Sequence, residues 1–183
     1  MADVRLFVSV AVPDTRELAS LRGELRAAGA RASPPEQTHL TLRFIGDVDE
    51  SRVNDVAAAA KAAVAGVGPF RVELSGVGAF PNRHNPSVVW VGAEPADVLG
   101  GIADRLGREL SARGIGYDSK PFKAHVTVGR CRNGLDSQDV FSRRRAGPFA
   151  SFECAEVLVM RSVLGPSGAR HSVLRRIPLG GAR

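Results

Sequence analysis

The sequence predicts an α+β fold with two similar lobes, and three observations support this prediction. Strand-like apolar runs alternate with helical stripes along the 183 residues. The order strand, proline, helix, loop and strand occurs twice, over residues 5–45 and 87–130. Each copy ends in a strand with the pattern His-x-Thr-apolar, and no Pro-, Gly- or Ser-rich linker separates the copies. We therefore expect residues 1–183 to form a single bilobal domain.

The first unit begins with an apolar strand at residues 5–12, which Pro13 ends. Asp14 and Glu17 have the spacing of a helix start, and leucines then recur at helical spacing until Gly29. The loop and the first-motif strand that complete this unit are expected at residues 33–36 and 38–45.

Three elements are expected between the two units. The alanine-rich segment 51–65 predicts a helix anchored by valines. Residues 70–74 alternate between apolar and polar side chains, as a strand does, and residues 81–86 predict a loop because they begin and end with proline.

The second unit repeats the order of the first. An apolar stripe over residues 96–113 predicts a helix between a strand at 87–92 and the second-motif strand at 122–130. The remaining expectations are a loop with a short helix at residues 133–148 and two final strands at residues 152–164 and 172–179.

The charge balance is basic and depends almost entirely on arginine. The net charge is +6 and the pI about 10.3, with 22 arginines against 3 lysines. Arginine binds phosphate in a bidentate manner, and a basic balance is typical of an RNA-binding surface. A GC-rich coding sequence would produce the same arginine bias, so both explanations stay open.

The sequence gives no sign of export or of membrane insertion. No apolar run approaches the roughly 20 residues that span a bilayer, and the N-terminus lacks the pattern of a secretory signal. Cys131 and Cys154 are far apart and do not have metal-type spacing. We expect a reduced, cytoplasmic chain, with a disulfide between these two cysteines as the alternative.

The doubled motif carries the chemistry. In a strand, residues i and i+2 share a face, so His39 and Thr41 point together, as do His125 and Thr127. Two such strands side by side would offer two imidazoles and two hydroxyls to one small site. Histidines can remove and donate protons near neutral pH, and the hydroxyls can bind phosphate oxygens. Such a site could cleave a phosphodiester without a metal.

Other interpretations of the motif remain. A single His-x-Thr is usually an ordinary histidine, although two copies in matching units favour a site. A zinc site would need further ligands, and neither motif has an Asp, Glu or Cys at i+2 or i+4. Cys131 is interpreted as a small apolar core residue rather than a nucleophile.

Several basic residues are candidates for substrate contacts. Arg43 and Arg130 follow their histidines at i+4 and i+5, and both are expected to bind phosphate or RNA. His171 is expected to line the cleft from the last strand. His84 is interpreted as a surface-loop residue, and the run 143–145 as solvated arginines or as an extension of an RNA-binding track.

These residues resemble those of the 2H phosphoesterase superfamily, in particular the bacterial and archaeal RNA 2′,3′-cyclic phosphodiesterases, also called 2′-5′ RNA ligases. The resemblance spans the whole chain and is far more specific than either tetrapeptide alone. The segments that carry it are residues 5–10, 38–48, 88–92 and 120–130.

The resemblance implies a bilobal fold, with two antiparallel sheets lining a central cleft and helices outside. It implies metal-free hydrolysis of a 2′,3′-cyclic phosphate on RNA to a 2′-phosphate, with no cofactor. His39 would be the proton donor and His125 the proton acceptor, while Thr41 and Thr127 hold the phosphate. Run in reverse, the site would join RNA ends by a 2′,5′ bond.

The resemblance also bears on the substrate end of the cleft and on partners. Many relatives carry Tyr where this chain has His171, and His171 and Ser172 are expected to contact the substrate. We expect a monomeric catalytic domain that acts on tRNA-like or oligonucleotide RNA with cyclic phosphate ends. The alternatives are an RNA-end binder without activity and an enzyme for a small cyclic nucleotide.

Overall fold

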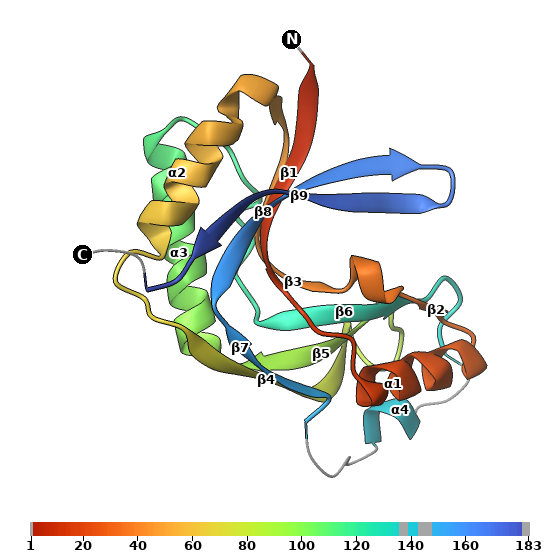
Figure 1. Cartoon of the computed structure of the whole chain (residues 1–183). Coiled ribbons are helices and arrows are strands. Elements are labelled where there is room, and N and C mark those ends of the chain that lie inside the picture. Colours follow the sequence, from red (N-terminus) through yellow and green to blue (C-terminus); the bar gives the residue numbers. More distant parts are fainter. Residues whose placement is uncertain (1, 136–138, 143–147, 181–183) are drawn as a thin grey trace.

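A computed structural model describes residues 2–135, 139–142 and 148–180, so the arginine run 143–145 lies outside the described residues. Two antiparallel sheets form the described part (Figure 1). Their orders are β3-β1-β8-β9 and β2-β6-β5-β4-β7. The strands are β1 (Asp3–Ala11), β2 (Arg31–Ala32), β3 (His39–Asp49), β4 (Phe70–Phe80), β5 (Val88–Glu94), β6 (His125–Arg130), β7 (Ala150–Cys154), β8 (Glu156–Gly165) and β9 (Gly168–Pro178).

The helices agree closely with the sequence pattern. They are α1 (Arg16–Ala27), α2 (Val53–Ala63), α3 (Ala96–Ala112) and α4 (Asp139–Ser142), with 3₁₀ turns η1 (Pro35–Gln37) and η2 (Glu50–Arg52). Thr15 caps α1, since its side chain accepts a hydrogen bond from the Leu18 amide. The predicted α+β fold and the doubled strand–helix–strand order are confirmed.

One predicted strand is wrong. A single strand is expected over residues 152–164, but the chain changes sheets at Ala155. β7 pairs with β4 in the five-stranded sheet, whereas β8 pairs with β1 and β9 in the other. Both strands are extended, so apolar periodicity does not distinguish one strand from two that belong to different sheets.

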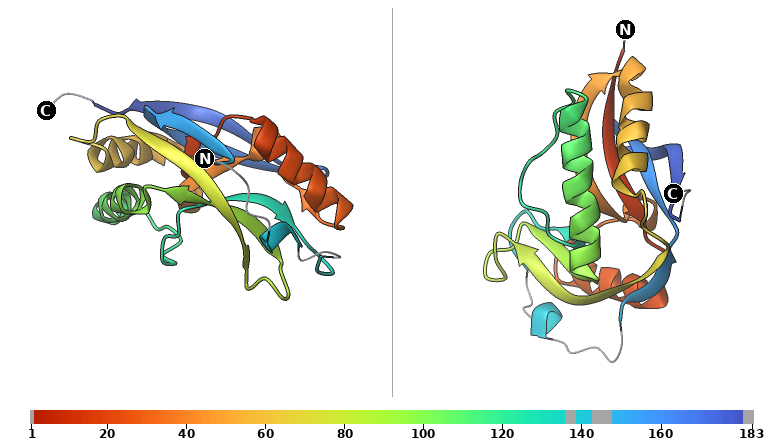
Figure 2. Two further views of the ribbon diagram at one scale, coloured as in Figure 1. Left: turned by 90° about the horizontal axis from the view of Figure 1, so that it is seen from below. Right: turned by 90° about the vertical axis from the view of Figure 1, so that its left-hand side faces the viewer.

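The helices of the two units pack across the molecule. α1 precedes the first-motif strand β3 in the chain, but it contacts β2 and β6 in the other sheet. α3 precedes the second-motif strand β6 and contacts β3 as well as β5 and α2. Figures 1 and 2 show α2 and α3 side by side at one end and α1 near β2 and β6 at the other. Helices α1 and α3 thus each contact the motif strand of the other unit, and this exchange of helices joins the two lobes through a shared core.

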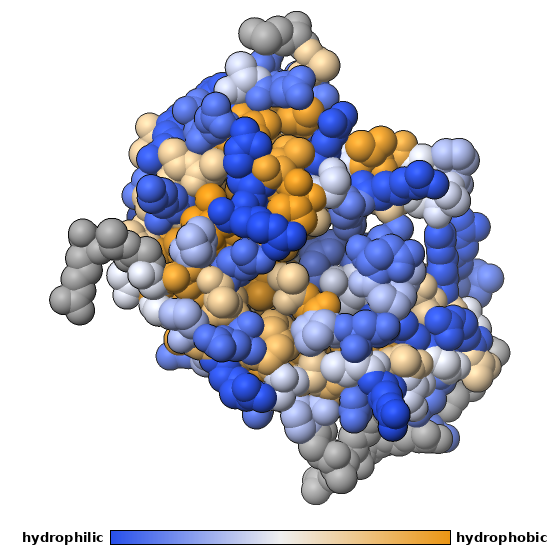
Figure 3. Space-filling view, in the orientation of Figure 1, coloured by the Kyte–Doolittle hydropathy of each residue, from blue (hydrophilic) through white to orange (hydrophobic). Residues whose placement is uncertain are grey.

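Burial follows the alternation expected for the motif strands. Leu40 and Leu42 are buried in β3, and Val126 and Val128 in β6, as predicted. Much of the face in Figure 3 is hydrophilic, with apolar surface gathered toward its upper half. No helix among the described residues is long and apolar enough to cross a membrane.

Candidate active site

Both copies of the motif open into one cavity of about 400 Å³, which we call the cleft. His39 and Thr41 reach it from β3, and His125 and Thr127 from β6. The other residues that line it are Phe7, Arg31, Ala32, Ser33, Pro34, Gln37, Phe44, Arg130, Ser162, Gly168, Ala169 and His171. The structure thus brings together the four motif side chains that the sequence singled out.

Each motif strand contains a β-bulge at the same offset. In β3, Thr41 pairs with Ser9 and Arg43 with Val8, so Leu42 is the extra residue. In β6, Thr127 pairs with Trp90 and Gly129 with Val89, so Val128 is the extra residue. A bulge moves the next side chains to the opposite faces of the strand. The cleft therefore receives the residues five after each histidine, Phe44 and Arg130.

The bulge explains why Arg43 does not line the cleft. Arg43 shares the core face of the sheet with Val8 and is only 9% exposed. Its Nε donates to the Ala103 carbonyl at 2.9 Å, and its Nη2 pairs with Asp104 at 3.3 Å. Its guanidinium also lies over the Tyr117 ring. Arg43 therefore joins β3 to α3, whereas Arg130 is exposed at the cleft.

The first imidazole lies in an aromatic pocket. His39 stacks on Phe7, with ring centroids 4.7 Å apart, and meets His171 edge-on at 5.0 Å. The pKa of His39 is lowered to about 4, mostly by burial and also by the adjacent His171, while a hydrogen bond to the Gln37 backbone opposes both. The free site therefore holds this imidazole neutral at pH 7.

The second imidazole has similar backbone support. Nδ1 of His125 lies 2.6 Å from the Lys123 carbonyl, so the Nδ1 proton is donated there and Nε2 faces outward as an acceptor. Burial lowers the pKa of His125; the Lys123 carbonyl opposes this, and the Lys123 charge adds to it. The ring packs edge-on against Phe80 and Trp90.

Gly78 gives Trp90 its place beside this imidazole. A Cβ on Gly78 would lie 2.3 Å from the Trp90 ring, so the ring needs the bare backbone of β4 beneath it. The Lys123 ammonium then lies 4.1 Å from the centre of the Trp90 ring. A cation over an aromatic face is held in place while its charge stays available to an anion.

The last strand contributes one of its two predicted residues. His171 lines the cleft, but Ser172 is exposed and does not. Neighbouring residues in a strand point to opposite faces, so both cannot reach the same cavity. Ser162, which pairs with His171 across β8 and β9, does line the cleft, as does Ser33. The structure therefore does not bring Ser172 to the cleft.

Unpaired polar atoms gather around the motifs. Among the described residues, the buried side-chain atoms without a hydrogen-bond partner are Oγ of Ser9, Nε1 of Trp90 and Nδ1 of His171. Ser9 lies opposite Thr41, Trp90 lies opposite Thr127, and His171 touches His39. Such atoms are rare in folded proteins, and their grouping here is typical of a functional site.

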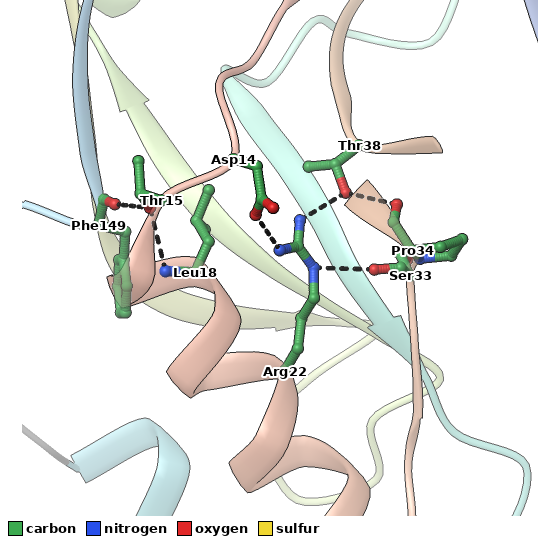
Figure 4. A network of polar contacts seen from close by, with 8 residues as sticks. All are labelled: Asp14, Thr15, Leu18, Arg22, Ser33, Pro34, Thr38 and Phe149. Atoms are coloured by element: carbon green, nitrogen blue, oxygen red, sulfur yellow. Dashed lines mark hydrogen bonds and ion pairs between the residues drawn. The ribbon is translucent and has the colours of Figure 1, made fainter. Parts of the chain in front are cut away.

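A buried arginine holds the segment that leads into the first motif (Figure 4). Arg22 of α1 is 2% exposed and donates to the Ser33 carbonyl and to Oγ1 of Thr38, each at 2.9 Å. It also pairs with Asp14 at 3.0 Å, and Thr38 in turn donates to the Pro34 carbonyl. Arg22 therefore fixes both ends of the segment 33–38, directly before His39.

The same segment connects both motifs and the β8–β9 hairpin. The Ser33 amide donates to the Val128 carbonyl in the second-motif strand at 2.9 Å. The Gln37 amide group donates to the Ala169 carbonyl, beside His171. The segment that Arg22 holds is therefore attached to every part of the chain that brings a histidine to the cleft.

The chemistry of the site is that of imidazoles, hydroxyls and guanidinium groups. No three His, Cys, Asp or Glu side chains converge on one point in the part of the chain that the structure describes. Burial raises the pKa of both cysteine thiols, to about 11 for Cys154, which opposes thiolate chemistry. His84 lies exposed in the loop after β4 and is absent from the cleft lining.

Sequence reasoning missed several residues of the cleft. Gln37 lies two positions before the first motif histidine, but in a 3₁₀ turn, where the alternation rule used for the threonines does not apply. Phe7, Arg31 and Ser162 could not be found this way, because they reach the cleft only through the pairing of strands distant in sequence.

Comparison with known families agrees with this geometry. Residues 10–90 match the family model of the LigT-like phosphoesterases. The chain is 33% identical over 176 residues to an RNA 2′,3′-cyclic phosphodiesterase of Archaeoglobus fulgidus, covering 94% of this chain and 98% of that one. It is 31% identical to the enzyme of the same name from Thermus thermophilus, covering 97% and 91%.

Solved structures show the same fold. A crystal structure of a Thermus thermophilus protein superposes with a TM-score of 0.77 at 29% identity, covering 98% of this chain and all of that one. Escherichia coli LigT in complex with 3′-AMP superposes with a TM-score of 0.75 at 22% identity, again covering 98% and 100%. The two-sheet architecture is therefore shared over the full length.

Proposed function

Because the chain belongs to the LigT-like phosphoesterase family, we propose that it hydrolyses 2′,3′-cyclic phosphates at RNA ends to 2′-phosphomonoesters. The observation that carries this proposal is the convergence of two imidazoles and two hydroxyls on one cleft of about 400 Å³. The relatives from Archaeoglobus fulgidus and Thermus thermophilus are named for this activity. An RNA substrate also suits the net charge of +6.

In the proposed reaction, Nε2 of His125 takes a proton from water while the water oxygen attacks phosphorus. The bond from phosphorus to O3′ breaks, and His39 gives its proton to O3′. The products are a 2′-phosphate and a free 3′-hydroxyl. Thr41 and Thr127 donate hydrogen bonds to the non-bridging oxygens, where negative charge gathers in the transition state. In reverse, a 5′-hydroxyl in place of water would give a 2′,5′ bond.

The surroundings of His125 support its role, whereas His39 has to gain its proton when the substrate binds. The Lys123 charge favours the neutral form of His125, which is the form that a base needs. Among the described residues, no comparable lysine or arginine contributes to the lowered pKa of His39, and a bound phosphate anion would favour its protonated form. The substrate itself would thus create the acid, and a metal is not needed for either proton transfer.

The test is turnover of adenosine 2′,3′-cyclic phosphate in the presence of a chelator, with the product identified by phosphorus NMR. We expect 2′-AMP, full activity with chelator, and no turnover by the double variant His39→Ala/His125→Ala. His84→Ala is the matched control and should keep full activity, since His84 is exposed away from the cleft. A 3′-phosphate product, or activity lost on chelation, would contradict the mechanism; tight binding of RNA ends without turnover would indicate a binding protein.

A further inference from the structure

A second cavity adjoins the cleft and has a different lining. It measures about 760 Å³ and shares Thr41, Phe44 and His125 with the cleft. The residues found only in the second cavity are Leu42, Arg43, Phe80, Asp118, Lys120, Pro121, Phe122 and Lys123. It therefore borders the reacting groups from one side, whereas the cleft contains all four motif side chains.

The lining combines aromatic rings with lysines. Phe44 is 40% exposed, which is unusual for a large apolar residue, and Phe80 and Phe122 lie partly exposed around the same cavity. Of the chain's three lysines, Lys120 and Lys123 both lie here, in a protein that otherwise uses arginine. Rings that stack on bases, beside cations that pair with phosphates, are the elements of a single-stranded nucleic-acid site.

We propose that this cavity binds the nucleotide on the 5′ side of the cyclic end, with its base against Phe44 and its phosphodiester near Lys120 and Lys123. The inference rests on the proposed function, because it places the cyclic phosphate between the motifs. The cleft then holds the terminal nucleotide of the RNA. The nucleotide that precedes it in the RNA lies past Thr41 and His125, in the second cavity. The preferred substrate is accordingly an oligonucleotide rather than a mononucleotide.

The experiment compares kcat/KM for adenosine 2′,3′-cyclic phosphate with that for the dinucleotide ApA carrying the same cyclic end. We expect the dinucleotide to be favoured by about tenfold, the scale of one stacked base. Phe44→Ala should remove most of this preference. Lys120→Ala should reduce it and weaken the salt dependence for the dinucleotide, while hydrolysis of the mononucleotide stays as it is.

Lys61→Ala is the matched control, because Lys61 is the third lysine and lies exposed on α2, outside both cavities. It should leave the preference and the salt dependence unchanged. Equal kcat/KM for the two substrates, or a preference that survives Phe44→Ala and Lys120→Ala, would overturn the inference while mononucleotide turnover still supported the proposed function. Failure to hydrolyse either substrate would instead overturn the proposed function.

Discussion

In β3 and β6 the bulge follows the motif threonine directly, and the residue five after each histidine turns into the cleft. That residue is Phe44 in one half and Arg130 in the other. Each histidine also has a hydrogen bond to the backbone two residues before it, at Gln37 and at Lys123. The two halves thus share a backbone arrangement and differ in the side chains attached to it.

The difference between the halves lies next to the imidazoles. His39 is enclosed by Phe7 and by His171, a neighbour that can lose its charge. His125 lies beside the Lys123 ammonium, which lowers its pKa. The comparison teaches that the repeated strands set the geometry, whereas the neighbouring side chains give the two histidines different surroundings, on which their proposed roles depend.

The largest expected effect comes from removing either histidine. His39→Ala and His125→Ala should each lower kcat on adenosine 2′,3′-cyclic phosphate by on the order of a hundredfold or more. A nucleoside 2′-phosphodiester with a p-nitrophenolate leaving group needs no proton donor, so it should restore turnover by His39→Ala but not by His125→Ala. Restoration of His125→Ala alone would reverse the assignment of donor and acceptor.

The threonines test whether the two halves hold the phosphate equally. Thr41→Val and Thr127→Val keep the shape of the side chain and remove one hydrogen-bond donor each. We expect kcat to fall by about ten- to a hundredfold in each variant, somewhat below the usual loss for an oxyanion donor, because the partner threonine remains. Steady-state kinetics should show a smaller change in KM; a loss in only one variant would show that a single half carries the phosphate.

Two buried arginines provide a matched pair for the supporting structure. Arg22→Met and Arg43→Met should each destabilise the chain by about 2–3 kcal/mol, since each leaves buried carbonyls without donors. Arg22→Met should also lower kcat by about tenfold, because Arg22 holds the segment before His39, and Arg22→Lys should recover part of it. Unfolding in urea and kcat on the mononucleotide separate the two effects. Equal kcat losses in both Met variants would assign Arg22 a general structural role.

A smaller effect is expected at the third histidine of the cleft. His171 contributes to the lowered pKa of His39, so His171→Phe should raise the pKa of His39 toward its ordinary value. NMR titration of the His39 ring measures this directly, with the pKa of His125 as the internal comparison. An unchanged His39 value would leave burial as the whole cause of the shift.

An effect on stability in acid is also expected. The pKa of His39 is about 4 in the folded chain and near 6.5 when unfolded, so below pH 6.5 the unfolded chain takes up this proton first. Stability should therefore be lost as the pH falls from 6.5 toward 4. The loss of stability between pH 6.5 and pH 4 can be measured as a fall in Tm. This fall should be smaller in His39→Gln than in the unsubstituted protein.

Periodicity alone was enough to predict most helices and strands, and the doubled motif predicted the convergence of His39, Thr41, His125 and Thr127. The placement of Arg43 outside the cleft could not be predicted, since a bulge adds one residue without changing the apolar pattern that surrounds it. The placement of Ser172 outside the cleft could not be predicted for a related reason: which residues of β9 reach the cleft depends on its register with β8.

The position of Arg22 in the sequence could have indicated that its side chain is buried and hydrogen-bonded. It lies four residues after Leu18 and so falls on the apolar face of α1, where a charged side chain is exceptional. A charge at such a position predicts a buried hydrogen-bonding role. Its partners, the Ser33 carbonyl and Thr38, could be identified only from the fold, because the loop between them has no periodic pattern.

The exchange of helices between the lobes has a mechanical consequence. α1 packs so closely on β6 that a Cβ on Gly129 would lie 3.1 Å from Leu25, and α3 is bonded to β3 through Arg43. A hinge motion that widened the cleft would pull each helix from the opposite sheet and expose apolar surface to water. We therefore expect the distance between the two imidazoles to change little when a phosphate binds between them.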